Sequence, residues 1–406
     1  MIPFPYRIAA IFVLLSSVLL SSPAHGAALG EQMAQGWDHF YNLEFPAAAR
    51  IFENAAAANP ASPLPRNGIA QSVLYGEMYR DGSLSSELVD GHNSFLRRPK
   101  MEASPALQQQ FLSSIDKSIQ LSDTLLARNP RDVDALHAKA VALALRSNWN
   151  FLVHKAWHDS LSDATASRKL EDQILAIDPK DIDAKLGQGV HEYIVGDLPW
   201  QWRTLGFLVG FHGDKVRGLA TVEQVAKNGN RNKADAEIIL CVLYRRERAS
   251  RKALPLLADL IKRYPRNYLL RLEQARMYDD LGDNGTAFKI LDQIEREREQ
   301  KVPDVANCPL EKIYYERATF LFWMGRIDEA QTNFQKVIAQ PQDLDLNTGV
   351  ISYLRLGQIQ DLRKQHVAAT PFYQKATEYA PESETAKEAR HFIDSPYHRP
   401  KRTYGP

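Results

Sequence analysis

The sequence has few cysteines and no surplus of charge. Its 406 residues include only Cys241 and Cys308, which are too few for the disulfide framework of a small secreted domain. The 50 Lys and Arg residues oppose 49 Asp and Glu residues, which leaves a formal net charge of +1 at pH 7. No overall electrostatic field therefore draws the chain to nucleic acid or anionic lipid, and we expect no nucleic-acid partner.

Catalytic motifs are also missing from the sequence. We find no glycine-rich phosphate loop, no Gly-x-Ser-x-Gly elbow and no convincing Cys–His–Asn set. We interpret acidic pairs such as those in residues 178–183 as helix caps. Function has to be argued from a site. Because no reactive site is evident, we predict a protein that is not an enzyme and needs no cofactor.

Long hydrophobic runs are scarce, and the N-terminal one suggests targeting. Arg7 precedes the apolar run from Ile8 to Leu20, and the small residues Ala24 and Gly26 follow it. This order is typical of a secretory signal peptide, so we predict that residues 1–26 are removed. The run is shorter than the roughly 20 apolar residues of a membrane-spanning helix, and an uncleaved N-terminal anchor is the alternative. We expect the mature chain in the periplasm or outside the cell.

Proline ends five amphipathic stretches of the chain. Because proline cannot continue a helix, each of these residues marks the end of a predicted helix. A small residue, Ala or Gly, lies ten positions beyond each of the first four prolines. The prolines are Pro60, Pro130, Pro179, Pro265 and Pro381, and the small residues are Ala70, Ala140, Gly189 and Ala275.

The spacing within a unit is fixed as well. One unit shows the order small, aromatic, Gly, Ala, large, and the next unit repeats the spacing with Leu at the aromatic position. The first set is Ala275, Tyr278, Gly282, Ala287 and Leu291, and the second is Ala318, Leu321, Gly325, Ala330 and Phe334. Small residues let two helices approach closely, and glycine at the turn accepts a positive φ.

This pattern resembles the tetratricopeptide repeat, a 34-residue helix–turn–helix unit. The steps from Gly36 to Ala70 and from Cys241 to Ala275 are both 34 residues. The resemblance covers about residues 30–382 and implies an all-α fold, a right-handed α-solenoid of about eight helix pairs. The key residues of the eight units are Gly36, Ala70, Ala140, Gly189, Cys241, Ala275, Ala318 and Gly357.

The predicted solenoid occupies residues 27–394 and is followed by a flexible tail at residues 395–406. Units two to four are longer than the repeat, since successive key residues there are 70, 49 and 52 residues apart. We predict helical inserts between the two helices of these units, at residues 81–105, 147–160 and 196–214. Equivalent loops of a solenoid lie along the same edge, so the inserts should form an insert cluster. It would contain four of the six tryptophans, Trp149, Trp157, Trp200 and Trp202.

The third insert contains the unusual sequence PWQWRTLGFLVGFHGD. Caps at Asp197 and Gly213 predict one short helix at residues 198–212 that has hardly any polar face. This helix is too short to cross a bilayer. We interpret it as a plug packed on the other inserts. A ligand pocket beside it and insertion into a membrane surface are the alternatives.

The same insert carries a second resemblance, through the residues GDLPW and LGFLVGFHGDKVRGL. It is similar to uncharacterised exported bacterial tetratricopeptide proteins with an insert-bearing repeat array. It also resembles a eukaryotic tetratricopeptide family linked with mitochondria and lipid bodies. Neither resemblance implies an activity, so no functional residue is carried over.

Two histidines of the second insert are weak candidates for a metal site. His154 and His158 are four residues apart and would share one face of a helix, as zinc ligands can. No Glu lies beside the first His, so the zincin pattern is missing. We interpret both as histidines on a partly buried polar face and expect no bound metal.

A basic run suggests where a partner binds. Ten Lys and Arg residues lie between Tyr244 and Arg276, and the usual interpretation is a solvated face. In the repeat geometry, however, Arg245 and Arg276 fall on the concave groove, and Tyr315 and Phe322 follow in the next unit. A groove with Arg and aromatic residues suits an acidic or carboxylate-ending peptide. The Lys/Asn carboxylate clamp of chaperone-binding members of the family is not matched.

These observations predict an exported non-catalytic scaffold that binds a protein or peptide through its groove, its insert cluster, or both. The alternatives are a membrane- or lipid-associated factor and a small-molecule or metal binder that uses the insert cluster. The candidate binding residues are Arg245, Arg276, Tyr315, Phe322, Trp149, Trp157, Trp200 and Trp202.

Overall fold

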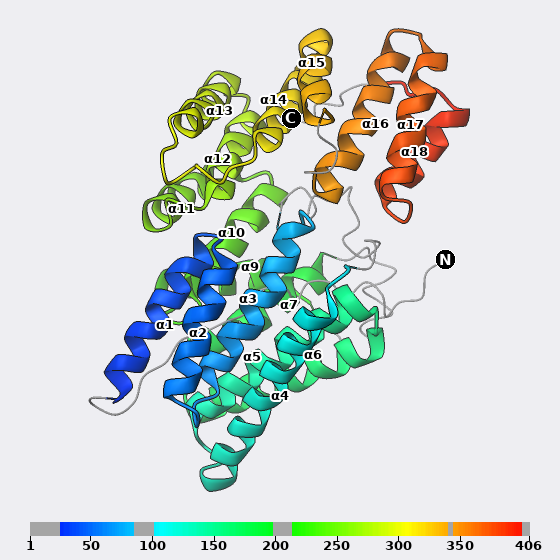
Figure 1. Ribbon diagram of the computed structural model, residues 1–406. Helices are drawn as coiled ribbons and strands as arrows, with labels where there is room; N and C mark the ends of the chain where they lie inside the picture. Colours follow the sequence, from blue (N-terminus) through cyan, green and yellow to red (C-terminus); the bar gives the residue numbers. More distant parts are fainter. Residues whose placement is uncertain (1–24, 85–100, 198–212, 340–343, 400–406) are drawn as a thin grey trace. The chain divides into compact units, whose positions relative to one another are not determined.

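The computed structural model describes residues 25–84, 101–197, 213–339 and 344–399 (Figure 1). Helices joined by turns and short loops form the regular structure of these residues, and no β-strand occurs among them. The predicted all-α fold is therefore confirmed. No helix in the described part of the chain is long and apolar enough to span a membrane. The helices form two compact units that divide after Pro265.

The first unit holds the described residues up to Pro265, apart from residues 80–84. One π-helical turn, η5, and one 3₁₀ turn, η6, lie among its α-helices. The elements are α1 His25–Tyr41, α2 Phe45–Ala58, α3 Leu64–Arg80, α4 Pro105–Arg128, α5 Val133–Trp149, η5 Asn150–His154, α6 Trp157–Ile177, η6 Asp183–Lys185, α7 Leu186–Gly196, α9 Lys215–Asn228, α10 Lys233–Arg246 and α11 Ser250–Arg263.

The second unit contains three helix pairs and a final helix that packs on α17. The final helix, α18, ends at Asp394, the last residue of the predicted solenoid. The helices are α12 Tyr268–Asp280, α13 Asn284–Glu299, α14 Leu310–Met324, α15 Ile327–Val337, α16 Leu346–Leu362, α17 His366–Tyr379 and α18 Glu384–Asp394.

The proline pattern predicts the helix ends correctly. Each of the five prolines lies two residues beyond the last residue of a helix, where the chain has to leave the helical path. The last helical residues are Ala58 of α2, Arg128 of α4, Ile177 of α6, Arg263 of α11 and Tyr379 of α17.

The key small residues lie where the two helices of a pair touch. Each belongs to the first helix of its pair, and we call these eight helices, α1, α3, α5, α7, α10, α12, α14 and α16, the inner helices. A Cβ at Gly36 would lie 2.4 Å from the ring of Phe52, and one at Gly357 would lie 2.5 Å from the ring of Tyr373. A larger residue at either position would push the pair apart, which explains the spacing rule.

The segment predicted as an insert at residues 147–160 belongs to the helices themselves. α5 continues to Trp149, the turn η5 follows, and Lys155 in the left-handed region (φ 56°) ends that turn. The hydroxyl of Ser147 donates a hydrogen bond to the carbonyl oxygen of Ser160 over 2.7 Å and joins α5 to α6. The insert prediction is wrong here because the extra length is taken up by long helices, 17 residues in α5 and 21 in α6.

The other two predicted inserts fall largely outside the described residues. This applies to most of residues 81–105 and to 198–212, and therefore to the short helix predicted in the third insert. The flanking residues of the third insert are in contact, since a Cβ at Gly213 would lie 2.3 Å from the backbone nitrogen of Gly196. Glycine at both positions lets α7 and the residues before α9 approach this closely.

Protein surrounds the inner helix α5 of the first unit. α5 buries 13 of its 17 residues, among them the polar His137 and Asn148, as expected for a helix enclosed on all sides. α1 and α10 also meet, since the hydroxyl of Tyr41 donates to Asp235 Oδ1 over 3.0 Å. The ring of Tyr41 lies 4.9 Å from that of Tyr264. The first and last helix pairs of this unit are therefore in contact.

Candidate binding surfaces

The predicted groove residue Arg276 lies inside the second unit. It is 6% exposed, and its Nε donates to Glu316 Oε2 over 2.8 Å. Glu273 accepts a further hydrogen bond from Arg276 Nη1 over 3.1 Å. The side chain of Glu316 is 0% exposed. The expectation that Arg276 faces solvent is wrong, because its charge is needed to neutralise a carboxylate buried between α12 and α14.

The aromatic pair of the predicted groove is buried as well. Tyr315 and Phe322 are 3% and 0% exposed and belong to one hydrophobic core cluster of the second unit. Arg245 is partly exposed in the last turn of α10, in the first unit. Of the four groove candidates, only Arg245 keeps a partly exposed side chain, and it belongs to the first unit, whereas the other three belong to the second.

A segment from the C-terminus covers this aromatic core. Residues 395–399 follow α18 without regular structure, and Tyr397 is 6% exposed within the same cluster as Phe322. Nη2 of Arg399 donates to the carbonyl oxygen of Phe322 over 2.6 Å. The prediction of a flexible tail beginning at residue 395 is therefore wrong for these five residues, because Tyr397 is buried in the core and Arg399 is hydrogen-bonded to Phe322.

Asp361 at the end of α16 holds this segment in place. Its Oδ2 accepts a hydrogen bond from the backbone N–H of Tyr397 over 2.7 Å and one from the Tyr373 hydroxyl over 2.6 Å. Its Oδ1 lies 2.8 Å from Nδ1 of His366, whose Nε2 lies 3.0 Å from the carbonyl oxygen of Ile393. Both ring nitrogens face acceptors, and these hydrogen bonds, led by that to Asp361, raise the pKa of His366.

The tryptophans assigned to the insert cluster have different environments. Trp149 is fully buried and stacks on Phe111 of α4, with 4.1 Å between ring centroids. Trp157 is partly exposed and meets Phe151 edge to face at 4.6 Å. Trp149 is therefore a core residue that joins helices. Trp200 and Trp202 lie outside the described residues, so the plug prediction remains a prediction.

The two histidines do not share a helix. His154 ends the turn η5, Lys155 breaks the helical path, and His158 belongs to α6. Both imidazoles are exposed. Within the described ranges, no group of three His, Cys, Asp or Glu side chains could hold a metal ion. The shared face expected from the spacing is wrong because the helix ends between the two residues.

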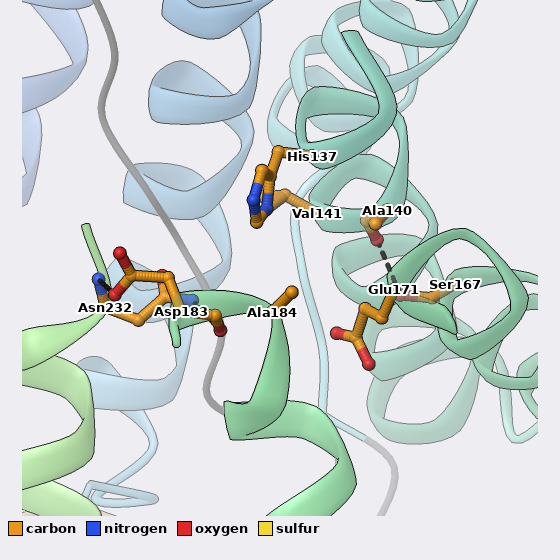
Figure 2. Close-up of a pocket in the computed structure, with 8 residues that line it drawn as sticks. All are labelled: His137, Ala140, Val141, Ser167, Glu171, Asp183, Ala184 and Asn232. Atoms are coloured by element: carbon orange, nitrogen blue, oxygen red, sulfur yellow. Dashed lines mark hydrogen bonds between the residues drawn. The ribbon is translucent and has the colours of Figure 1, made fainter. Parts of the chain in front are cut away.

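A small polar cavity lies inside the first unit (Figure 2). Its volume is about 10 Å³, at the lower limit for one water molecule and far below the roughly 300 Å³ of a small-molecule site. Asp183 accepts backbone hydrogen bonds from residues 230–232 beside it, and Asn232 Oδ1 has no hydrogen-bond partner. The cavity fits a buried water better than a substrate.

Glu171 lines the same cavity from α6 (Figure 2). Burial, and to a smaller extent the neighbouring Asp172, raises the pKa of its carboxyl group to about 8, while Arg168 opposes the shift. The carboxyl group is therefore mostly neutral at pH 7. Its 8% exposure and its place beside Gly187 give it a packing role.

The repeat pattern of the sequence does not indicate Asp361, Tyr397 or Arg399 as site residues. The available signal was the composition of the final segment, SPYHRPKRTYGP, which contains two tyrosines. Aromatic residues are depleted in segments that remain solvated. No periodic pattern pointed to Asp361, because its role depends on a chain segment more than 30 residues away.

A comparison with protein families agrees with the repeat architecture. The Iml2/Tetratricopeptide repeat protein 39 family matches residues 182–342, which include the insert at 196–214. No curated protein matches the chain. The solved human IFIT1 dimer with m7Gppp-AAAA is 16% identical, with 93% of this chain and 88% of that chain covered and a TM-score of 0.43. A tetratricopeptide repeat protein from Parabacteroides merdae ATCC 43184 is 16% identical, with 77% and 93% covered and a TM-score of 0.20.

The family match and the helix pairs lead to the same assignment. The matched region contains the key residues Gly189, Cys241, Ala275 and Ala318, each in the first helix of a pair. The pairs end at the predicted prolines and close over the predicted small residues. The chain is a tetratricopeptide-type repeat protein with an all-α solenoid fold, and over residues 182–342 it is similar to the Iml2/Tetratricopeptide repeat protein 39 family.

Proposed function

We propose that the mature chain is an exported, non-catalytic scaffold that binds a protein or peptide partner. One observation carries the proposal: the inner helices α14 and α16 hold an irregular chain segment through Phe322 and Asp361. A surface that fixes a non-helical segment by backbone and side-chain contacts has the physical property that peptide recognition requires. Arg245, which is partly exposed in the first unit, is a separate candidate contact.

The ionisable groups support a binding role rather than a reactive one. Buried carboxylates such as Glu316 and Glu192 pair with Arg276 and Arg217. Such pairs hold helices together and leave no poised nucleophile and base among those four groups. The thiol of Cys308 has its pKa raised to about 12 by burial, which makes it a poor nucleophile.

Binding is tested by capture from an envelope fraction, followed by calorimetry with the purified partner. We expect Arg245→Glu to weaken binding about tenfold or more, because a charge-assisted hydrogen bond contributes about 1.5–3 kcal/mol. Arg251→Glu is the matched control, since Arg251 is exposed on α11, outside the inner helices. If both variants weakened binding equally, Arg245 would not be a specific contact with the partner. A chain that retains no saturable protein ligand would refute the binding role.

Export is tested by sequencing the N-terminus of the mature chain. We expect it to begin near Ala27, because the apolar run and the small residues before that position are typical of signal-peptide cleavage. The measurement is Edman or mass-spectrometric sequencing of protein from the periplasm or medium. A membrane-bound form that retains residues 1–26 would support the uncleaved anchor instead.

The alternative functions have direct tests of their own. Flotation of the mature chain with anionic and zwitterionic liposomes examines the lipid-associated alternative. Elemental analysis of the native protein examines the metal-binding alternative. Nucleic acid is not part of the proposal, because a net charge of +1 supplies no attraction to phosphate backbones.

A further inference from the structure

We propose that the surface formed by α14 and α16 is a peptide-binding site that residues 395–399 occupy in cis. Its partner in trans would present an extended segment with tyrosine two residues before arginine. This inference rests on the proposed binding function and adds the site, the ligand class and the competition between the two segments.

Tyr397 supplies the central anchor. Its backbone N–H donates to Asp361 Oδ2 over 2.7 Å, and its ring meets Phe392 edge to face at 5.3 Å. The side chain is 6% exposed among Phe322, Leu356 and other members of the core cluster. Asp361 therefore recognises the backbone of the segment, and the apolar core recognises an aromatic side chain.

Arg399 supplies the second anchor. Its guanidinium lies 5.1 Å from the centroid of the Phe322 ring, and Nη2 donates to the carbonyl oxygen of Phe322 over 2.6 Å. Phe322 lies in the last turn of α14, where the negative end of the helix dipole favours a cation, and its carbonyl oxygen also accepts the backbone N–H of Gly325 over 3.1 Å. The contact combines a charge-assisted hydrogen bond with a cation–π interaction, which selects Arg over an uncharged residue.

The spacing of the two anchors defines the ligand. Alternate side chains of an extended segment point to the same side, so residues 397 and 399 can reach one surface together. His398, between them, is exposed. The shortest sequence that this surface recognises is therefore a tyrosine, any one residue and an arginine.

The site is held together by contacts that do not involve the segment. Asp361 is fixed by the Tyr373 hydroxyl over 2.6 Å and by His366 over 2.8 Å. Arg355 of α16 lies 5.0 Å from the Phe322 ring and 4.9 Å from that of Trp323. A preorganised binding surface loses less conformational entropy when its ligand binds.

Occupation in cis makes the site selective. A segment attached to its own site acts at an effective concentration on the order of millimolar. A partner with the same short sequence has to compete with that concentration, so it binds well only when it makes further contacts elsewhere. Removing residues 395–406 should therefore expose the site to short peptides.

The test uses a chain that ends at Asp394 and a fluorescent synthetic peptide of residues 395–399, SPYHR. We expect saturable binding to the truncated chain in fluorescence anisotropy, at least tenfold tighter than to the full chain. Peptides with alanine in place of the tyrosine or of the arginine are the matched controls and should bind at least tenfold more weakly. If the truncated chain folds but does not bind the peptide, residues 395–399 are only a part of the fold and the proposal is overturned.

A second variant covers the case in which the truncated chain does not fold. Full-length Arg399→Ala keeps Tyr397 and should bind the SPYHR peptide more tightly than the wild-type chain does, with an unchanged circular dichroism spectrum. No gain in affinity would overturn the proposal. Self-association of the wild-type chain that Arg399→Ala abolishes would make a second copy the occupant and overturn the assignment of a partner. Neither of these two outcomes would alter the result expected for Arg245→Glu, because that variant tests partner binding through the first unit.

Discussion

Replacing Trp149 with alanine is expected to destabilise the first unit by about 3–5 kcal/mol, the usual loss for a fully buried tryptophan. Trp149 has 0% exposure and lies nearly parallel to Phe111, at 12° and 4.1 Å between ring centroids. Its removal would leave a cavity between α4 and α5 that rigid neighbouring helices fill poorly. Urea unfolding followed by circular dichroism measures the loss.

Trp157→Ala is the control for Trp149. Trp157 is partly exposed and has its edge-to-face contact with Phe151 at 4.6 Å, so its truncation should have a smaller effect. Similar losses for the two variants would contradict the distinction between a core tryptophan and a peripheral one. If Trp149→Ala kept its stability but bound the partner more weakly, Trp149 would be a binding residue, as the sequence predicted.

Glu316→Ala is expected to destabilise the second unit by about 3–5 kcal/mol, because it leaves the buried guanidinium of Arg276 without its main partner. Glu316 is 0% exposed, and Arg276 Nε donates to it over 2.8 Å. Glu273 remains as a partner at 3.1 Å but cannot satisfy the same donors. Chemical unfolding of the two proteins gives the difference in the free energy of unfolding.

Arg326→Ala is the matched variant for an exposed ion pair. Arg326 pairs with Glu329, and their side chains are 47% and 54% exposed. Pairs of this kind contribute about 0–1 kcal/mol. If Glu316→Ala also lost no more than about 1 kcal/mol, the Arg276 pair would not be a structural element of the core.

The parts of the fold that were predictable depend on local chemistry. Proline cannot continue a helix, so Pro60 and its counterparts fix helix ends whatever surrounds them. Close packing of two helices demands a small residue, and the positions of Gly36 and Gly357 follow from that demand. The left-handed turns at Gly282 (φ 79°) and Gly325 (φ 86°) need glycine for a similar reason.

The length of the second predicted insert could not be interpreted from spacing. A gap of 49 residues between Ala140 and Gly189 fits an inserted loop or two longer helices equally well. The structure shows longer helices, and η5 accommodates the break between them. Trp149 was therefore predicted in the insert cluster but lies in the core, at the end of α5.

The aromatic core of the second unit was only partly predictable. The repeat pattern put Tyr315 and Phe322 in the same groove, whereas the structure buries both in one core cluster. The same cluster contains Tyr397, which comes from the irregular segment after α18. Contacts between segments without periodicity leave no signal in the spacing of residues.

The contact between Tyr41 and Asp235 changes how the first unit has to fold. In a linear repeat array each unit touches only its neighbours, so stability adds up unit by unit and folding can start anywhere. The hydrogen bond across 194 residues adds a contact of high sequence separation, whose loop has to close before the contact is formed. The helix pairs of this unit therefore gain cooperativity at the expense of folding speed, and we expect them to unfold together rather than fray from one end.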